Sequence, residues 1–539
     1  MPEDLSIQPE VDENKTANEQ EIRNRKQSKK TSRNERYGED DTTSKKYGFH
    51  VAPLNTPLEN RLQTLGIMWH CMSIPFFVSL FLIVLSLGWV AWLTIILPYF
   101  IWWYGFDLHT PTNGKAAYRP KDWMRNLIVW QWFVSYFPIE VHKSCDLAPT
   151  YTEVMVEDNT EPDDEEDLIS EDTRTNIDKL FMKLGLSKRL NDFDSTKIVD
   201  SQADKKKGNF KITKVSHGPR YIFGYHPHGV ISMGVMGTFA TNIIRNEPFE
   251  PPLKCLRAFF YDPANKEKLL PGIGNVFPLT LTTQFTLPFY RDYLMSLGLT
   301  SASGKNIKRI INNGDNSVCL VVGGAQESLL NDVVASHSRR GKKYKEDSKN
   351  EKAARSEEDE GKSDESPTAD QKNSSKEIRL VLNKRKGFIK IAIELGNISL
   401  VPTFGFGEAD IYRVKQPKPG SIGSKFQKWM KSTFQFTVPF FSARGVFLYD
   451  FGLLPYRNPI NICMGRPIHV PKEALQDYLK EHPAFEKDHL DTKKATGKIQ
   501  VPPELVDHYH KLYVDELKRV FEENKGNYGY DDVELKIIE

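Results

Sequence analysis

Cysteine is scarce in this sequence of 539 residues and is never closely spaced. No two of the five cysteines form a Cys-x-x-Cys pair: Cys71, Cys145, Cys255, Cys319 and Cys463. This spacing argues against a disulfide framework and against a structural zinc site, and it suits a reducing compartment. An excess of one charge is also missing, because 73 Lys and Arg balance 71 Asp and Glu. With no basic stripe interleaved with aromatics, the sequence predicts no nucleic-acid partner.

Large apolar side chains are rare in the first fifty residues, which are dense in charged residues, Asn and Ser. Such a segment cannot bury enough surface to offset its ordering entropy, so we predict a disordered tail over residues 1–60. Its polarity also argues against a secretory signal peptide. Two further charged stretches, an acidic and polar one over 151–210 and a mixed one over 331–376, are interpreted as solvated insertions, the second of them disordered.

Charge disappears between Arg61 and Asp107, where forty-five residues contain no Asp, Glu, Lys or Arg. About 18 such residues already suggest a membrane helix, and one straight helix of this length would span roughly twice the apolar core of a bilayer. We therefore predict a hairpin with legs of about 17 residues that reverses near Gly88. Basic residues flank both ends, which places both ends in the cytosol. Residues 123–141 are predicted to follow as an interfacial helix, so the membrane part covers 61–150.

Short apolar runs separated by Gly, Pro and helical stretches begin at about residue 211. Five of these runs are predicted to be strands: 221–226, 275–279, 317–322, 398–404 and 460–465. Three helices are predicted, at 304–313 with Ser303 as its cap, at 384–395 before Gly396, and along the tail after Pro502. The alternation indicates an α/β fold, with a mostly parallel or mixed sheet flanked by helices. The catalytic domain is predicted to comprise 211–330 and 377–539.

Two histidines follow the first predicted strand in the sequence YHPHG, residues 225–229. Residues at the carboxyl ends of strands form the site in α/β sheets, so His226 and His228 are candidates. A metal site would need further ligands at other strand ends, and the remaining histidines do not supply them, so no metal is predicted. Two interpretations stay open at this point, because the histidines could cap a turn or act as general bases.

A second polar cluster follows the predicted strand 317–322, in the sequence VVGGAQES. Its carboxylate, Glu327, is a candidate to hydrogen-bond a histidine ring and fix the tautomer. The paired Gly323 and Gly324 permit close backbone approach, and their N–H groups could stabilise an oxyanion. Two glycine-flanked polar clusters at two strand ends favour a common site.

Longer motifs match one family in order and spacing: SYFPIEVHK (135–143), YHPHG (225–229), YRDYLMSLG (290–298), VVGGAQESLL (321–330), RKGFIKIAIELGNISLVPTFGFGE (385–408) and GLLPYRNPINICMGRPIHV (452–470). Over 60–150 and 210–539 the chain resembles the type-2 acyl-CoA:diacylglycerol acyltransferases, and its tail resembles the fungal branch. The resemblance implies a glycerolipid-acyltransferase-like fold at the endoplasmic reticulum membrane and lipid droplet, with the catalytic part in the cytosol. It implies that triacylglycerol is made from a diacylglycerol and an acyl-CoA co-substrate, without a cofactor.

The resemblance also implies catalytic roles. The wider acyltransferase group carries His, four residues, then Asp, but here Ile231 and Met233 stand where that Asp would follow each histidine. A carboxylate must then come from elsewhere, and we predict that Glu327 supplies it. Since plant members of the family often replace the first histidine by Glu, His228 is predicted to be the base and His226 to support it.

Substrate contacts are implied in the same way. The residues predicted to bind substrate are Gly229, Gly323, Gly324, Arg291, Arg385 and Glu408. The glycines would hold the oxyanion through backbone N–H groups, and the two arginines, or Lys386, would pair with CoA phosphates. The bilayer and the lipid-droplet surface are expected partners, and a homo-oligomer stays open. The rival functions are a monoacylglycerol or wax-alcohol acyltransferase and a non-catalytic lipid-droplet membrane protein.

Overall fold

The computed structural model describes most of the chain outside the charged stretches. The described residues are 45–46, 49–50, 55–157, 194–198, 210–263, 266–328, 330, 376–415, 420–421, 425, 429, 440–447, 452–483, 485–486 and 499–539. The predictions for the tail over 1–60 and for the insertions over 151–210 and 331–376 therefore fall largely outside the described residues.

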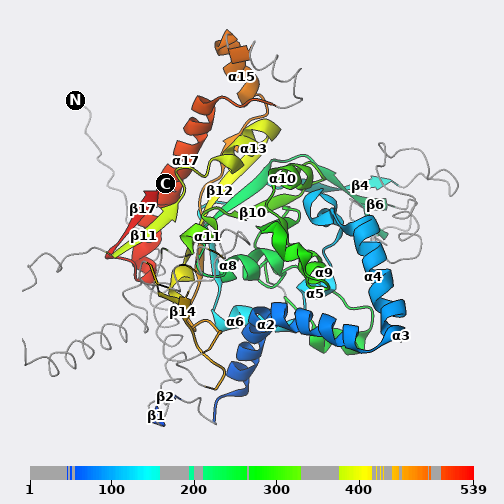
Figure 1. Cartoon of the computed structure of the whole chain (residues 1–539). Helices are drawn as coiled ribbons and strands as arrows, with labels where there is room; N and C mark the ends of the chain where they lie inside the picture. Colours follow the sequence, from blue (N-terminus) through cyan, green and yellow to red (C-terminus); the bar gives the residue numbers. More distant parts are fainter. Residues whose placement is uncertain are drawn as a thin grey trace, which may run out of the picture.

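An eight-stranded mixed sheet forms the centre of the fold (Figure 1). Its strands follow the order β3-β15-β12-β7-β10-β8-β9, and β16 pairs with β12 off this path. Their bounds are β3 Glu140–Lys143, β7 Arg220–His226, β8 Val276–Thr280, β9 Thr300–Ser301, β10 Ser317–Val321, β12 Ile398–Phe406, β15 Asn461–Met464 and β16 Ile468–Val470. Strands β12, β7, β10, β8 and β9 run parallel, whereas β15 and β16 are antiparallel to β12. The predicted α/β class with a mixed sheet and the five predicted strands are confirmed.

Both faces of the sheet are covered, which explains the apolar runs. Along β7, Tyr221 and Phe223 pack into the core on one face, whereas Ile222 between them packs into the core on the other face. A strand buried on both faces has no reason to alternate polar and apolar residues. The helices of the first core are α6 Ile128–Tyr136, α8 Met233–Val235 with its continuation η6 Met236–Ala240, and α9 Tyr290–Ser296. The helices of the second core are α10 Gly304–Ile311, α13 Gly387–Leu395 and α17 Pro503–Asn524.

Helices α10, α13 and α17 confirm the three predicted helices. Ser303 stands at the amino end of α10 but makes no capping hydrogen bond, so its predicted capping role is wrong. Gly396 ends α13 with a φ of +64°, a conformation that favours glycine. The parallel pair of β11 Lys376–Val381 and β17 Val533–Ile538 was not predicted, and it brings the end of the chain beside α11 Gly324–Glu327 (Figure 1).

Two helical runs near the amino-terminal end of the described chain are long and apolar enough to cross a membrane: α2 Leu58–Ser86 and Trp89–Thr112. The chain turns between them at Gly88, where a turn was predicted, with a φ of +87°. α2 has 29 residues, and the second run has 24, so both legs are longer than predicted. The second run comprises α3 Trp89–Ala91, η2 Trp92–Ile96, α4 Leu97–Trp102, η3 Trp103–Asp107 and η4 Thr110–Thr112. Its many exposed apolar side chains, Trp89 among them, suggest association with a membrane.

The first turns of α2 pack against α6 and the first core, which accounts for the extra length of the first leg. Gly66 lies so close to α6 that a Cβ there would come within 2.6 Å of the backbone nitrogen of Phe133. Ile67 is fully buried in the core. Figure 1 shows that α2 then changes direction on its way to α3, and Pro75 inside the helix permits such a bend.

Residues 123–141 differ from the single interfacial helix that the sequence predicted. They form most of α5 Asp122–Arg125, all of α6 and the start of β3, and Trp130 is fully buried. Arg125 is buried as well, and its guanidinium donates to two backbone carbonyls near the end of η6. The arginine in this apolar run is therefore satisfied inside the domain rather than by lipid headgroups.

Smaller elements complete the described chain. A three-stranded antiparallel sheet joins β4 Tyr151–Glu157, β6 Phe210–Ser216 and β5 Asp194–Ile198. The remaining elements are β1 Lys45–Lys46, β2 Phe49–His50, η5 Lys115–Tyr118, η7 Lys254–Phe259, η8 Thr282–Thr286, η10 Glu408–Asp410, β13 Arg413–Lys415, β14 Phe440–Ser442, α15 Ala474–Glu481 and η11 Lys525–Tyr528.

Candidate active site

The carboxyl end of β7 leads directly into the YHPHG motif. His226, the last residue of β7, is fully buried, and its Nε2 lies 3.0 Å from the hydroxyl oxygen of Tyr513 on α17. That hydroxyl donates to the carbonyl of Gly224 at 3.1 Å, so Nε2 carries a proton and donates to Tyr513. Burial lowers the pKa of His226 to about 3, which keeps the ring neutral. His226 therefore anchors the end of the strand to α17.

His228 is half-buried, and its ring is held in one tautomer. Nδ1 lies 2.9 Å from the carbonyl oxygen of Gly229, which can only accept a hydrogen bond, so Nδ1 carries the proton. The lone pair is then on Nε2. Burial lowers the pKa of His228 from its usual 6.5, so the imidazole is neutral at pH 7. A neutral, partly exposed imidazole with Nε2 unprotonated has the properties of a general base.

Glu327 lies beneath this loop and is fully buried. Its Oε1 accepts the backbone N–H of His228 at 2.6 Å, and its Oε2 accepts the backbone N–H of Val381 in β11 at 2.9 Å. The sequence predicted a contact with the histidine ring, but the structure shows that the carboxylate holds the backbone instead. Burial raises the pKa of Glu327 to about 7. Gly323 has to be glycine here, because a Cβ would overlap the Glu327 carboxylate.

Glu408 holds the other end of the same loop. Its Oε1 accepts the N–H of Met233 at 2.7 Å, and its Oε2 accepts the N–H of Gly234 at 2.9 Å and the hydroxyl of Tyr225 at 2.7 Å. These N–H groups lie at the start of α8, where a negative charge is favourable. Burial raises the pKa of Glu408 to about 7. Glu408 is 1% exposed, so it positions the loop from behind rather than facing a substrate as predicted.

Gly229 and Gly324 both have backbone conformations that favour glycine. Gly229 has a φ of +59°, and a Cβ there would come within 3.0 Å of the Glu408 carbonyl oxygen. Gly324 also has a positive φ, +62°, and it starts α11 directly after the strand β10. The backbone between β7 and α8 is thus fixed at both ends, and His228 lies between the two fixed points.

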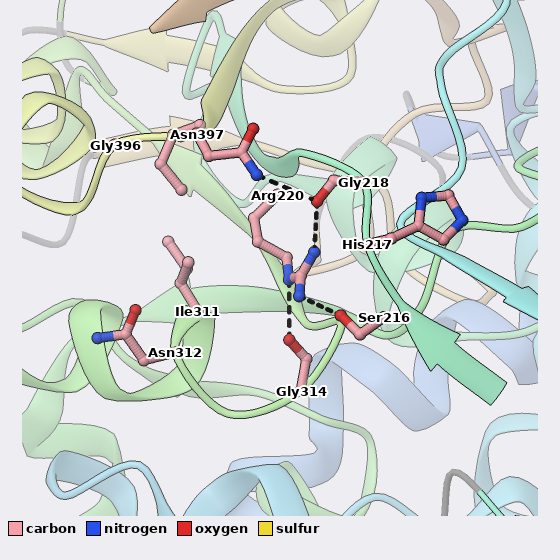
Figure 2. A pocket seen from close by; sticks show the side chains of 10 residues that line it. Ser216, His217, Gly218, Arg220, Ile311, Asn312, Gly314, Gly396 and Asn397 are labelled. Atoms are coloured by element: carbon pink, nitrogen blue, oxygen red, sulfur yellow. Dashed lines mark hydrogen bonds between the residues drawn. The ribbon is translucent and has the colours of Figure 1, made fainter. Parts of the chain in front are cut away.

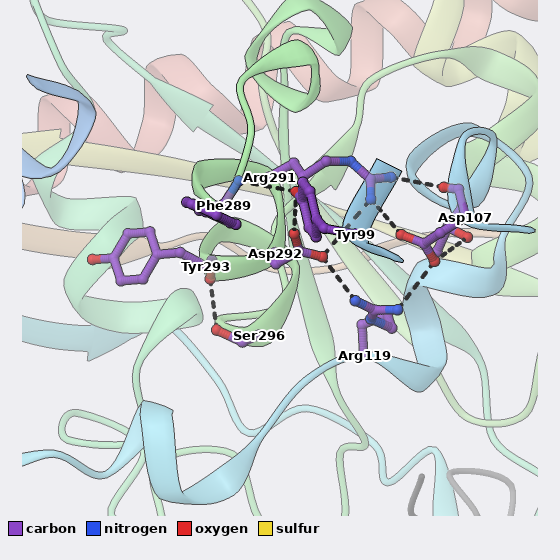
Figure 3. A network of polar contacts seen from close by, with 9 residues as sticks. Tyr99, Asp107, Arg119, Phe289, Arg291, Asp292, Tyr293 and Ser296 are labelled. Atoms are coloured by element: carbon purple, nitrogen blue, oxygen red, sulfur yellow. Dashed lines mark hydrogen bonds and ion pairs between the residues drawn. The ribbon is translucent and has the colours of Figure 1, made fainter. Parts of the chain in front are cut away.

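Arg291 is not available to a phosphate, which contradicts the prediction that it binds CoA (Figure 3). Its side chain is fully buried, and its Nη1 and Nη2 donate to Oδ2 and to the backbone oxygen of Asp107 at 2.5 and 2.7 Å. The guanidinium also lies 4.9 Å from the ring centre of Trp103. Arg119 bridges Asp107 and Asp292. This network fixes the end of the second apolar run to α9.

The cations after β11 remain accessible. Arg385 is exposed, and its charge lowers the pKa of Glu327 against the larger effect of burial. Lys386 is paired with Asp507 of α17 at 2.6 Å. Of the predicted CoA-binding cations, Arg385 is therefore the one that the structure leaves exposed near the motif.

A cavity of about 310 Å³ lies at the opposite end of β7 (Figure 2). Arg220 in its wall donates to the carbonyls of Gly218 and Gly314 and to the hydroxyl of Ser216, so its donors are used within the fold. Across the part of the chain that the structure describes, no group of three or more His, Cys, Asp or Glu side chains is placed to hold a metal ion.

Comparison with known proteins gives the family. A family model described as diacylglycerol acyltransferase matches residues 86–157, 210–271, 252–341 and 367–482. A diacylglycerol O-acyltransferase 1 of Saccharomyces cerevisiae is 36% identical over 489 residues, which cover 90% of this chain and 88% of the relative. The chain belongs to the diacylglycerol acyltransferase family. The family predicted from the motifs is confirmed, and the chain is an O-acyltransferase of lipid metabolism.

Other members of the diacylglycerol acyltransferase family and its neighbours match over similar lengths. Diacylglycerol O-acyltransferase 2A of Umbelopsis ramanniana is 30% identical, with 90% of this chain and 93% of the relative covered. The 2-acylglycerol O-acyltransferase 1 of Bos taurus is 28% identical, with 90% and 98% covered. No solved structure matches, so the glycerolipid-acyltransferase-like fold stays a prediction.

Sequence reasoning missed the tyrosines and the strand that complete the site. Tyr513 reaches His226 from a helix 287 residues further along the chain, and Tyr225 binds Glu408 across 183 residues. Tyr225 belongs to the motif and could have been included for that reason. Tyr513 and Val381 carry no local signal, because their roles depend on how α17 and β11 pack.

Proposed function

We propose that this chain transfers the acyl group of an acyl-CoA to the free hydroxyl of a diacylglycerol, giving triacylglycerol, with His228 as the general base. The observation that carries the proposal is the state of the His228 ring. Its Nδ1 proton is bound to the Gly229 carbonyl, so Nε2 is free to accept a proton. The names of the relatives support diacylglycerol as the acceptor.

In the proposed reaction, Nε2 of His228 takes the hydroxyl proton as the alcohol oxygen attacks the thioester carbon. The tetrahedral oxyanion forms, the carbon–sulfur bond breaks, and the imidazolium returns its proton to the CoA sulfur. The backbone N–H of His228 is bound to Glu327 and so does not serve the oxyanion. We assign that role to the backbone N–H groups of Gly229, Gly323 and Gly324.

The diacylglycerol acceptor is dissolved in the bilayer, so the site has to lie beside the membrane. Ile231, three residues after His228, exposes 41% of an apolar side chain, which suits a loop that meets acyl chains. We propose residence in the endoplasmic reticulum membrane, with the catalytic part in the cytosol, and on the lipid-droplet surface. Acyl-CoA acts as a co-substrate without a separate cofactor in this proposal, and homo-oligomerisation stays a prediction.

A second acceptor class is supported by one of the comparisons. The Bos taurus relative is named a 2-acylglycerol O-acyltransferase and is covered over 98% of its length. Monoacylglycerol is therefore the alternative acceptor, and the chemistry at His228 would be the same.

The test supplies purified protein in vesicles with labelled acyl-CoA and a panel of diacylglycerol, 2-monoacylglycerol and a long-chain alcohol. We expect triacylglycerol as the main product. His228→Ala should abolish it, whereas His508→Ala, an exposed histidine on α17, should not. A preference for monoacylglycerol would establish the alternative acceptor. Equal synthesis by wild type and His228→Ala would refute the general-base mechanism.

A further inference from the structure

A cavity of about 700 Å³ lies where the second apolar run meets α10, away from the YHPHG motif. Its walls are formed by His109, Thr112, Asn113, Thr282, Ser303, Lys305 and Arg309. We infer that this cavity holds the phosphate groups of the acyl-CoA, with Lys305 and Arg309 as their counter-ions. The inference rests on the proposed function and names the phosphate subsite of the same substrate.

The charges of the side chains that line this cavity indicate an anionic ligand. The walls hold two permanent cations and one histidine, and the lining residues include no Asp or Glu. Lys305 and Arg309 are exposed, and neither forms an ion pair with any residue that the structure describes. Neighbouring cations do have carboxylate partners. Lys308 on the same helix forms an ion pair with Glu394, and Arg119 forms ion pairs with Asp107 and Asp292. Two cations that lack carboxylate partners in one cavity suit phosphate.

An unpaired hydroxyl gives a second and independent indication. The side-chain oxygen of Ser303 is shielded from solvent and has no hydrogen-bond partner in the described part of the chain. It stands at the amino end of α10, in the position where a capping bond is expected, yet it makes none. A hydroxyl donor beside Lys305 is therefore left for an acceptor that the chain itself does not supply.

The register of the sheet places this cavity on the same edge as His228. Val321 of β10 pairs with Tyr225 of β7, and Thr280 of β8 pairs with Ser301 of β9. Because β8, β9, β10 and β7 are parallel, the residues just after β8 and β9 emerge at the edge where His228 lies. Thr282 and Ser303 are these residues.

The separation fits the length of the coenzyme. Three strand spacings lie between β7 and β9, which is about 14 Å at 4.7–4.9 Å each. About thirteen bonds join the thioester sulfur of the coenzyme to its first phosphorus. At 3.3–3.6 Å for every three bonds, this arm of the coenzyme extends to about 15 Å. A thioester at His228 therefore places the phosphates at this cavity.

The membrane run helps to form the same cavity. His109 and Thr112 lie at the end of the second apolar run, and that run docks through the Thr300 hydroxyl, which donates to the Pro111 carbonyl at 3.0 Å. The phosphate end of the coenzyme would thus lie at the edge of the membrane, while its acyl chain points toward lipid. This arrangement suits a substrate that is charged at one end and apolar at the other.

The test measures KM for acyl-CoA in neutral phosphatidylcholine vesicles. We expect Lys305→Ala and Arg309→Ala to raise this KM roughly tenfold each, the effect of losing one charge-assisted hydrogen bond, with kcat changed less than threefold. The Ki of free CoA as an inhibitor should rise in parallel, and KM for diacylglycerol should not change. Lys390→Ala, an exposed cation on α13, is the matched control and should leave all constants unchanged.

An acyl ester of dephospho-CoA, which lacks the 3′-phosphate, identifies the group that is bound. If either cation holds that phosphate, wild type should discriminate between the two esters and the corresponding variant should not. An unchanged KM and Ki in both variants would overturn the inference. It would also be overturned if the variants differed from wild type only in vesicles that contain anionic lipid, since the cavity would then bind a headgroup. Neither result would affect the proposed function, which is tested separately by the acceptor panel and by His228→Ala.

Discussion

Replacing Glu327 with glutamine tests how the His228 loop is held. The carboxylate accepts two backbone N–H groups, from His228 at 2.6 Å and from Val381 at 2.9 Å. Glutamine keeps one acceptor oxygen and turns an amide donor toward the other N–H group, so one hydrogen bond to a charged group is lost. That loss lowers the free energy of unfolding by about 1.5–3 kcal/mol.

A second effect of the same substitution has the opposite sign. Burial raises the pKa of Glu327 from 4.5 to about 7, and such a shift destabilises the ionised folded state by about 3 kcal/mol above pH 7. The two effects nearly cancel, so we expect the free energy of unfolding at pH 8 to change by less than about 2 kcal/mol in Glu327→Gln. In wild type the folded state binds the extra proton, so the contribution of Glu327 to stability falls as pH rises from 4.5 to 7. The variant should lose this slope.

Activity should respond more strongly than stability. The backbone of His228 is no longer fixed in Glu327→Gln, and a misplacement of about 1 Å can lower a rate by about a hundredfold. We expect kcat for triacylglycerol formation in vesicles to fall by 10- to 100-fold, with the acid limb of the pH–rate profile unmoved because His228 sets it. Glu534→Gln, an exposed glutamate on β17, should behave like wild type. An unchanged kcat in a folded Glu327→Gln protein would refute the role assigned to this carboxylate.

Three further predictions concern other parts of the account. Burial lowers the pKa of His228, and a general base acts in its deprotonated form, so kcat should fall in acid only below pH 6.5. A midpoint above pH 6.5 in the pH–rate profile would contradict this. Gly323→Ala would force a Cβ onto the Glu327 carboxylate and should lower the free energy of unfolding by about 1–3 kcal/mol. An unchanged melting temperature would contradict this, because it would show that the loop can move to accept the Cβ. Arg291→Met leaves Asp107 without one of its cations, so urea titration in detergent should show a loss of about 3 kcal/mol in the free energy of unfolding. Lys390→Ala, at an exposed position, should show none.

The sheet and its helices could be predicted from the sequence because burial on both faces leaves a local signal. The mostly apolar runs that became β7 and β12 are buried along almost their whole length, and Gly396 marks the end of α13 by itself. The pair of β11 and β17 left no such signal, because its strands meet across more than 150 residues and, among the described strands, pair only with each other. Pairing of this kind is set by the packed domain rather than by a local pattern.

The candidate site divides in the same way. The positions of His226, His228 and Glu327 at the ends of strands followed from the motifs, but the partner of Glu327 did not, since it depends on the path of the loop. Burial of Arg291 could not be predicted either, because its carboxylate partner, Asp107, is 184 residues away. A lone arginine in the sequence looks the same whether it meets a phosphate or a buried aspartate.

The central claim is that Nε2 of His228 accepts the proton of the lipid hydroxyl. The most direct measurement compares kcat of His228→Gln with that of His508→Gln in the same vesicles at saturating acyl-CoA and diacylglycerol. Glutamine approximates the size of the ring but cannot take the proton, so kcat at position 228 should fall by about 10²- to 10⁴-fold while position 508 stays at the wild-type value. A His228→Gln enzyme that retained kcat within a factor of two of wild type would contradict the account.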